Sequence, residues 1–173
     1  MHSSDLEAFH LYEDCEFSCE SVWKWVRIVA QKNVQHITLH HCGYTYPPPA
    51  IFCCTNLRTL KLAHYNLSLL PTHFDGFRYL NSCIFHSMGL TDEILARFIS
   101  HCPFLQKLDL EQCVGLQKPI ISSLTIAHLC VTTFYGYQLT VNCQNLITLK
   151  TRSHIKDLKV NGVTVLRAFS CNC

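Results

Sequence analysis

A recurring six-residue pattern constrains this chain more than any other feature of its sequence. An apolar residue stands at the first, fourth and sixth positions, as in Leu57-Arg-Thr-Leu60-Lys-Leu62 and Leu105-Gln-Lys-Leu108-Asp-Leu110. Five copies begin at residues 6, 34, 57, 80 and 105, so neighbouring copies are 23 to 28 residues apart. A fixed spacing of this length predicts a stack of similar units, each of which buries its apolar face against the next.

The spacing lies within the ~20–29 residues of a leucine-rich repeat. Further candidate units begin at Ile121, Leu146, Ile155 and Val163, where the intervals become uneven. We therefore expect a single leucine-rich-repeat domain over residues 1–173, regular over about 6–126, less regular over 127–173, and part of a longer protein. The expected fold class is α/β, a solenoid arc with a parallel sheet on its concave face and helices and irregular turns on its convex face.

Segments between the copies fit the convex side. Residues 92–102 follow Thr91, a suitable N-cap, and place acidic residues in the first helical turn, so they predict a helix. A second helix is expected over residues 21–30, between the first two copies. The run Pro47-Pro48-Pro49 excludes a helix interior, which leaves an extended or 3₁₀ crossover there.

Two cysteines occupy a special place in the pattern. Cys42 and Cys113 each follow the last apolar residue of a copy after two intervening residues, where the repeat carries Asn or Cys. A small polar or thiol group at this point hydrogen-bonds backbone that the turn leaves unpaired. We therefore expect both thiols to be buried and structural.

Side chains alternate along a strand, so the neighbours of an inward-facing leucine point the other way. If Leu60 and Leu62 enter the core, residues 59, 61 and 63 lie on the concave face. Extended to the other copies, this rule predicts a partner-binding face made of His10, Tyr12, Thr38, His40, Thr59, Lys61, Ile84, His86, Lys107, Asp109, Glu111, Thr125, Lys150, Arg152 and Lys159. Solenoids bind partners on such faces. The simpler alternative is that these are solvated strand positions.

The histidines and carboxylates raise the question of chemistry. His40 and Cys42 share one face of their strand while His41 faces the other, and no pair has the spacing of zinc ligands, so we expect no metal and no cofactor. The sequence holds no nucleophile elbow, phosphate loop, HExxH or GxGxxG segment, so we expect no enzyme. Asp109 and Glu111 resemble a catalytic carboxylate pair, but Lys107 beside them makes a charge-balanced surface patch the simpler interpretation.

Composition limits the partners and the compartment. The formal charge of +2 argues against nucleic acid or an acidic membrane surface as a partner, and no apolar run reaches the ~18 residues of a membrane helix. The N-terminus has no basic and apolar leader, so we expect an intracellular protein, cytoplasmic or nuclear, with free thiols. Adjacent Cys53 and Cys54 are expected to be inert, and Cys171 and Cys173 to be inert and exposed.

The ordered run of these residues resembles the plant F-box/leucine-rich-repeat proteins that often carry an FBD region. The resemblance covers about residues 6–160. Its residues are Trp23-Lys-Trp25-Val26, Asn33-Val34-Gln-His-Ile37-Thr-Leu39, Tyr46-Pro47-Pro48, Ile51-Phe52-Cys53-Cys54-Thr-Asn-Leu57-Arg-Thr-Leu60-Lys-Leu62, Asn66-Leu67-Ser68, Gly89-Leu90-Thr91-Asp92-Glu93 and Cys102-Pro103-Phe104-Leu105-Gln-Lys-Leu108.

The resemblance implies a protein–protein recognition module, the repeat region that selects a protein substrate for a cullin-type ubiquitin ligase. In that family an N-terminal F-box docks a Skp-type adaptor. No F-box segment precedes Leu6 and no FBD region follows Val160, so we expect adaptor binding only if an F-box is supplied elsewhere.

Other interpretations of the repeats stay open. One is an immune-type or scaffold module without a ubiquitin link. The other is a truncated gene product without a partner. Coding sequence upstream of Met1 would distinguish the immune-type or scaffold module from a ligase subunit, because a ligase subunit would carry an F-box there. Neither end of the chain carries a polar cap, so we also expect self-association through the terminal repeats.

Overall fold

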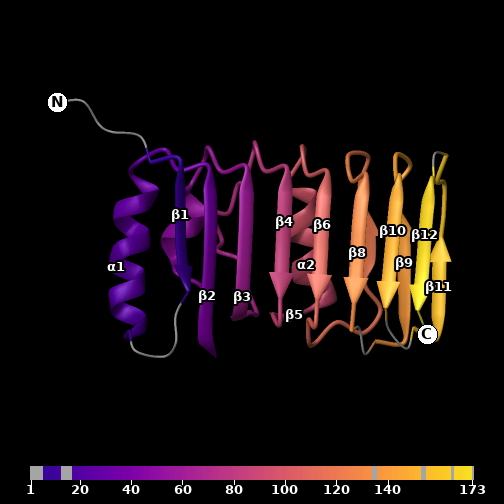
Figure 1. Cartoon of the computed structure of the whole chain (residues 1–173), viewed down its shortest axis with the longest axis horizontal. Helices are drawn as coiled ribbons and strands as arrows, with labels where there is room; N and C mark the ends of the chain where they lie inside the picture. Colours follow the sequence, from indigo (N-terminus) through magenta and orange to yellow (C-terminus); the bar gives the residue numbers. More distant parts are fainter. Residues whose placement is uncertain (1–5, 13–16, 134–135, 153–154, 165, 173) are drawn as a thin grey trace.

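The computed structural model describes residues 6–12, 17–133, 136–152, 155–164 and 166–172. Its main sheet is parallel and runs in the order β1-β2-β3-β4-β6-β8-β10-β12, with the short strand β5 (Gly89–Leu90) paired beside β3. Figure 1 shows these strands side by side across the length of the molecule. Their bounds are Ala8–Tyr12, His36–Thr45, Thr59–Leu67, Ser82–His86, Lys107–Glu111, His128–Thr132, Thr148–Arg152 and Ala168–Asn172.

The pairing of the strands confirms the five regular copies. Leu60 on β3 is level with Ile37 on β2 and Cys83 on β4, which in turn is level with Leu108 on β6. Each of these side chains is at most 1% exposed, because the apolar positions of successive copies stack into one continuous column. The structure therefore agrees with the expected α/β class and with the expected parallel sheet. It places one strand in each copy.

The units after residue 126 differ from those expected at Ile121 and Ile155. The main sheet continues through units that begin at Ile126 and Leu146, because Leu129 and Leu149 are level with Leu108. The segments at Ile121 and Ile155 instead form strands of a second parallel sheet. This sheet has the order β11-β9-β7, with β7 at Ile120–Ser122, β9 at Gln138–Asn142 and β11 at Asp157–Val160.

We use the name back layer for the elements that cover one side of the main sheet. It consists of α1 (Cys19–Ala30), the 3₁₀ turn η1 (Pro49–Cys53), α2 (Asp92–Ser100) and the second sheet. Figure 1 shows α2, β9 and β11 behind the main-sheet strands. Thr91 caps α2 by accepting a bond from the Ile94 amide, as the sequence predicts. The second sheet was not predicted.

The core lies between the main sheet and the back layer. Phe98 of α2 packs against Phe74, Phe77 and Phe85, with ring centroids 5.2 to 6.1 Å apart. Aromatic pairs at this separation add to the stabilisation that burial already gives. This cluster fixes α2 against β4, and thereby holds the strands that carry the open side of the sheet.

Backbone turns at the strand ends follow one rule. His64, Ser87, Gln112 and Thr133 each stand directly after a strand's outward-facing residue, and each has a positive φ of 49 to 61°. The amides of the last three donate to carbonyl oxygens of the following strand, at 2.6 to 3.0 Å. The left-handed residue therefore turns the chain towards the back layer without losing the ladder of hydrogen bonds.

Only one of the two structural cysteines agrees with the prediction. Cys113 is buried, and its thiol donates towards the carbonyl oxygens of Phe85 at 3.5 Å and Glu111 at 3.7 Å. Cys42 is exposed and disulfide-bonded, so the expectations of a buried and a free thiol are both wrong there. The cause is that β2 continues to Thr45 instead of turning after His40, so strand alternation from Ile37 and Leu39 carries His41 inward and leaves Cys42 outward.

Two further expectations stay predictions. The side chains of Cys171 and Cys173 fall outside those that the structure describes, and the curvature of the stack into an arc stays a prediction. Among the described residues, no helix has the length and apolar character needed to span a membrane.

Candidate protein-binding face

No element of the described residues covers the side of the main sheet away from the back layer, and we call this side the open face. It corresponds to the concave face expected from the sequence. By strand alternation its described residues on β1 to β4 are Ala8, His10, Tyr12, His36, Thr38, His40, Thr59, Lys61, Ala63, Ser82, Ile84 and His86. On β6, β8 and β10 they are Lys107, Asp109, Glu111, His128, Cys130, Thr132, Thr148, Lys150 and Arg152.

Most of the residues proposed from the sequence lie on this face. Thr125 and Lys159 do not, and for these two the expected position is wrong. Thr125 precedes β8, and its hydroxyl donates to the Leu105 carbonyl oxygen at 2.9 Å. Lys159 lies on β11 in the second sheet, 3.5 Å from the Asp157 carboxylate. Both errors follow from assigning the segments at Ile121 and Ile155 to the main sheet.

Charges at the centre of the open face are paired. The Lys107 ammonium lies 3.1 Å from an Asp109 carboxylate oxygen, and His86 Nδ1 lies 3.1 Å from a Glu111 oxygen. Each carboxylate therefore has its own partner, the lysine ammonium for Asp109 and the histidine ring for Glu111. The geometry agrees with the expected charge-balanced patch at Lys107 and does not present Asp109 and Glu111 as a free acid–base pair.

A row of rings crosses the N-terminal half of the open face. We call Tyr12, His40, His64 and His86 the histidine row. Successive ring centroids along it are 6.3, 4.9 and 5.6 Å apart, and the two contacts made by His64 are edge-to-face. Burial, followed by the neighbouring imidazoles of His40, His86 and His41, lowers the pKa of His64. The row therefore brings together rings from four neighbouring strands, β1 to β4.

Sequence reasoning missed His64 as a member of this face. Strict alternation directs residue 63 outward and residue 64 inward. The left-handed backbone of His64, with φ of 61°, breaks that alternation. A positive φ cannot be read from hydrophobic spacing, although His is one of the residue types enriched in this conformation.

The C-terminal half of the open face contains a polar pocket of about 340 Å³ at the ends of β6, β8 and β10. Glu111, Lys150 and Arg152 line it, so the fold brings together three residues that the sequence proposed separately. Cys130 also lines it and was missed, because the unit that begins at Ile126 was not recognised. Burial is the main cause that raises the pKa of the Cys130 thiol.

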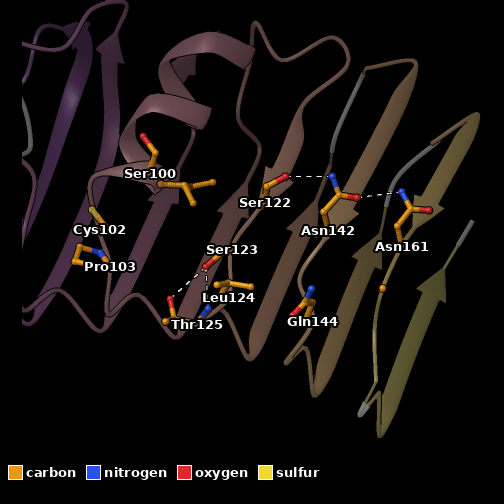
Figure 2. A pocket seen from close by; sticks show the side chains of 12 residues that line it. Ser100, Cys102, Pro103, Ser122, Ser123, Leu124, Thr125, Asn142, Gln144 and Asn161 are labelled. Carbon is orange, nitrogen blue, oxygen red and sulfur yellow. Dashed lines mark hydrogen bonds between the residues drawn. The ribbon is translucent and has the colours of Figure 1, made fainter.

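A larger pocket of about 690 Å³ lies in the back layer, between the end of α2 and the second sheet. Figure 2 shows a chain of side-chain hydrogen bonds along it, in which Asn161 donates to Asn142 at 3.0 Å and Asn142 donates to Ser122 at 3.1 Å. Leu124, 65% exposed, borders the same pocket. The bonds join β7 and β9 to Asn161, the residue directly after β11, which is a structural role for these amides.

Four of the described thiols are held in their protonated form by burial. Burial raises the pKa of Cys54 and Cys102 to about 12, and that of Cys113 and Cys143 to about 11, so these thiols are protonated and weakly nucleophilic at neutral pH. Over the described ranges, no group of three or more His, Cys, Asp or Glu side chains has a geometry that could hold a metal ion.

Comparison with known proteins places this architecture in a family. Residues 22–170 match the model of the leucine-rich repeats of the FBD-associated F-box protein At5g56370. No solved structure matches.

Two curated relatives from Arabidopsis thaliana are similar in sequence. The F-box/FBD/LRR-repeat protein At1g13570 is 26% identical over 98% of this chain and 36% of its own length. The F-box/FBD/LRR-repeat protein At5g56420 is 28% identical over 62% of this chain and 26% of its own length. The chain therefore spans about a third or less of the relatives it matches. It belongs to the leucine-rich-repeat region of the plant F-box/FBD-associated family.

Proposed function

We propose that this repeat region recognises a protein substrate on its open face and selects it for a cullin-type ubiquitin ligase. One observation carries the proposal: the described elements cover the main sheet on one side only. The back layer buries the apolar column of the repeats, while the other side presents polar and charged side chains from seven described strands. An extended, uncovered sheet face of this kind is the surface that repeat proteins use for binding.

The chemistry of the open face suits a protein partner better than a small substrate. Its paired charges, its rings and the half-buried Ile84 between Lys61 and Asp109 combine apolar and polar contacts over a wide area. Protein interfaces mix the same contributions, with aromatic and charged anchors near their centre. These groups follow one another across the open face with few interruptions. This arrangement favours recognition of the surface of a folded protein or of an extended protein segment.

The ligase connection comes from the family. Both relatives are named for an F-box and an FBD region in addition to their repeats. In such a protein the F-box docks a Skp-type adaptor, and the repeats hold the substrate. We infer the same division for the full-length protein to which this chain belongs, with substrate choice made by the open face.

A charge-reversal experiment tests this proposal. Lys61→Glu changes the charge of the open face, and Lys118→Glu makes the same net change at an exposed position in the loop before β7. Each tagged protein, wild type or variant, is used to capture proteins from plant extract, and the captured proteins are quantified by mass spectrometry. We expect a protein captured by the wild type and by Lys118→Glu to be lost with Lys61→Glu.

The ligase role needs a second measurement. The captured protein should accumulate when the proteasome is inhibited, and should carry ubiquitin that depends on the full-length F-box protein. Capture that is equal for the two variants would exclude the open face. A captured protein whose ubiquitination does not depend on the F-box protein, and whose abundance does not change when the proteasome is inhibited, would instead support a scaffold without a ubiquitin link.

A further inference from the structure

The N-terminal half of the open face has an unusual distribution of charge. Among its described residues on β1 to β4, five are histidines and one, Lys61, is a lysine, while none is Asp or Glu. The first described carboxylates on the open face are those of β6, where Asp109 lies against Lys107 and Glu111 against His86. The surface thus carries cationic and titratable groups without carboxylates of its own.

The fold holds the rings of the histidine row in a fixed arrangement. His40 and His86 come from the outward positions of β2 and β4, and the left-handed turn of His64 places its ring between them. Tyr12 extends the row to β1, and Glu111 closes its other end. Imidazoles held this close attract anions together, because each becomes a cation and a hydrogen-bond donor when protonated.

We propose that the histidine row and Lys61 form the docking site for an acidic segment of the partner protein, and that this segment binds more tightly as the pH falls. The proposal rests on the proposed function, because it names the chemistry of the partner that the open face takes. Charge complementarity supports this proposal. A carboxylate-rich segment would contact Lys61 and the imidazoles of the histidine row, in the half of the open face whose described residues include no Asp or Glu.

The direction of the pH effect follows from linkage. A partner carboxylate near an imidazole favours its charged form, so the complex binds more protons than the free protein, and affinity rises as the pH falls. Burial and the neighbouring imidazoles disfavour the charged form of His64 in the free protein, which adds to this uptake.

Several titratable or charged groups surround the row. They are His10 on β1, His41 on the inner side of β2, Lys61 on β3 and Glu111 on β6, and Tyr12 within the row is itself titratable. In the sequence, Glu13, Asp14 and Glu16 follow Tyr12 and lie outside the described residues. Every variant below retains them, so they do not affect the comparison.

Fluorescence anisotropy with a labelled hexaglutamate peptide tests the proposal. The peptide is titrated with the 173-residue protein at pH 7.5, 6.5 and 5.5 and constant low ionic strength, since salt screens exposed charges. Glutamate stays ionised over this range. We expect binding that is about tenfold tighter at pH 5.5 than at pH 7.5, the effect of taking up one proton over one pH unit. A labelled hexalysine peptide should not bind.

Matched variants identify the site. The double variant His40→Gln, His86→Gln removes two rings of the row. The control variant His73→Gln, His128→Gln removes two exposed histidines, one in a loop and one on β8 of the same face. The first should lose the pH dependence and the second should keep it. In the variant His64→Asn, asparagine tolerates the left-handed backbone, and the pH dependence of binding should become weaker without being lost.

Imidazole proton resonances give a second readout that needs no variant. The imidazole resonances of His40, His64 and His86 should change their chemical shifts when hexaglutamate is added at pH 6.5, and those of His73 should not. Affinity independent of pH, or an equal loss in both double variants, would overturn the proposal. If hexaglutamate fails to bind while Lys61→Glu still abolishes capture of the natural partner, the open-face function stands and the acidic-segment inference is wrong.

Discussion

Replacing Gly76 by alanine tests how tightly neighbouring repeats interlock. Gly76 has φ of 95°, and a Cβ added there would lie 1.8 Å from the carbonyl oxygen of His101, the residue that ends α2 in the next repeat. Carbon atoms settle at about 3.5–4.0 Å from their neighbours. Because the obstacle is backbone, a side-chain rotation cannot relieve the overlap, and the loop or the helix end must move.

The expected cost has two parts. An alanine in the left-handed region costs about 1–2 kcal/mol, and overpacking against a fixed neighbour adds about 1–3 kcal/mol. We therefore expect Gly76→Ala to lower the free energy of unfolding by about 2–5 kcal/mol. Gly162→Ala is the matched control, since Gly162 has φ of 67° but its added Cβ would lie 3.9 Å from the Gln144 side chain.

Urea denaturation followed by the fluorescence of Trp23 and Trp25 measures both variants. Gly162→Ala should show only the backbone part, about 1–2 kcal/mol. Gly43→Ala, where φ is not positive and the nearest atom is 3.9 Å away, should be nearly neutral. If Gly76→Ala costs no more than Gly162→Ala, the close approach of Gly76 to His101 and the interlock inferred from it are wrong.

Three other substitutions test single contacts. Asp92→Ala removes a carboxylate that accepts bonds from the Gln117 and Lys118 amides at 3.0 and 2.8 Å, and it should lower the free energy of unfolding by about 1.5–3 kcal/mol in urea titrations. Thr151→Val replaces a hydroxyl that is buried without a hydrogen-bond partner in the described structure, so thermal melting should show a gain of about 1–3 kcal/mol. Cys113→Ala should cost about 1–3 kcal/mol, whereas Cys53→Ala, at an exposed thiol, should leave the melting temperature unchanged.

The N-terminal two thirds of the fold could be predicted because its units share one pattern and lie 23 to 28 residues apart. After Leu110 the units shorten to 21 and 20 residues, as the positions of Leu105, Ile126 and Leu146 show. A strand rises about 3.3 Å per residue and a helix about 1.5 Å, so a strand crosses the back of the sheet with fewer residues. The shorter spacing was the available signal for the second sheet.

The binding face was predicted as far as strand alternation reaches. His40 and His86 were found because their strands are regular up to those residues. His64 was not, because its left-handed backbone breaks the alternation, and the outward position of Cys42 conflicted with the expected inward turn because β2 continues beyond His40. Such departures depend on contacts between neighbouring repeats, which hydrophobic spacing does not encode.

Site-specific photo-crosslinking tests whether the open face is where a partner protein binds. A benzophenone amino acid replaces Ile84 on β4 of the open face in one protein, and Ile120 on β7 of the back layer in the other. Both are irradiated in plant extract and analysed by mass spectrometry. We predict a specific crosslinked protein from position 84 that is absent from position 120. The same product from position 120, with none from position 84, would contradict the account.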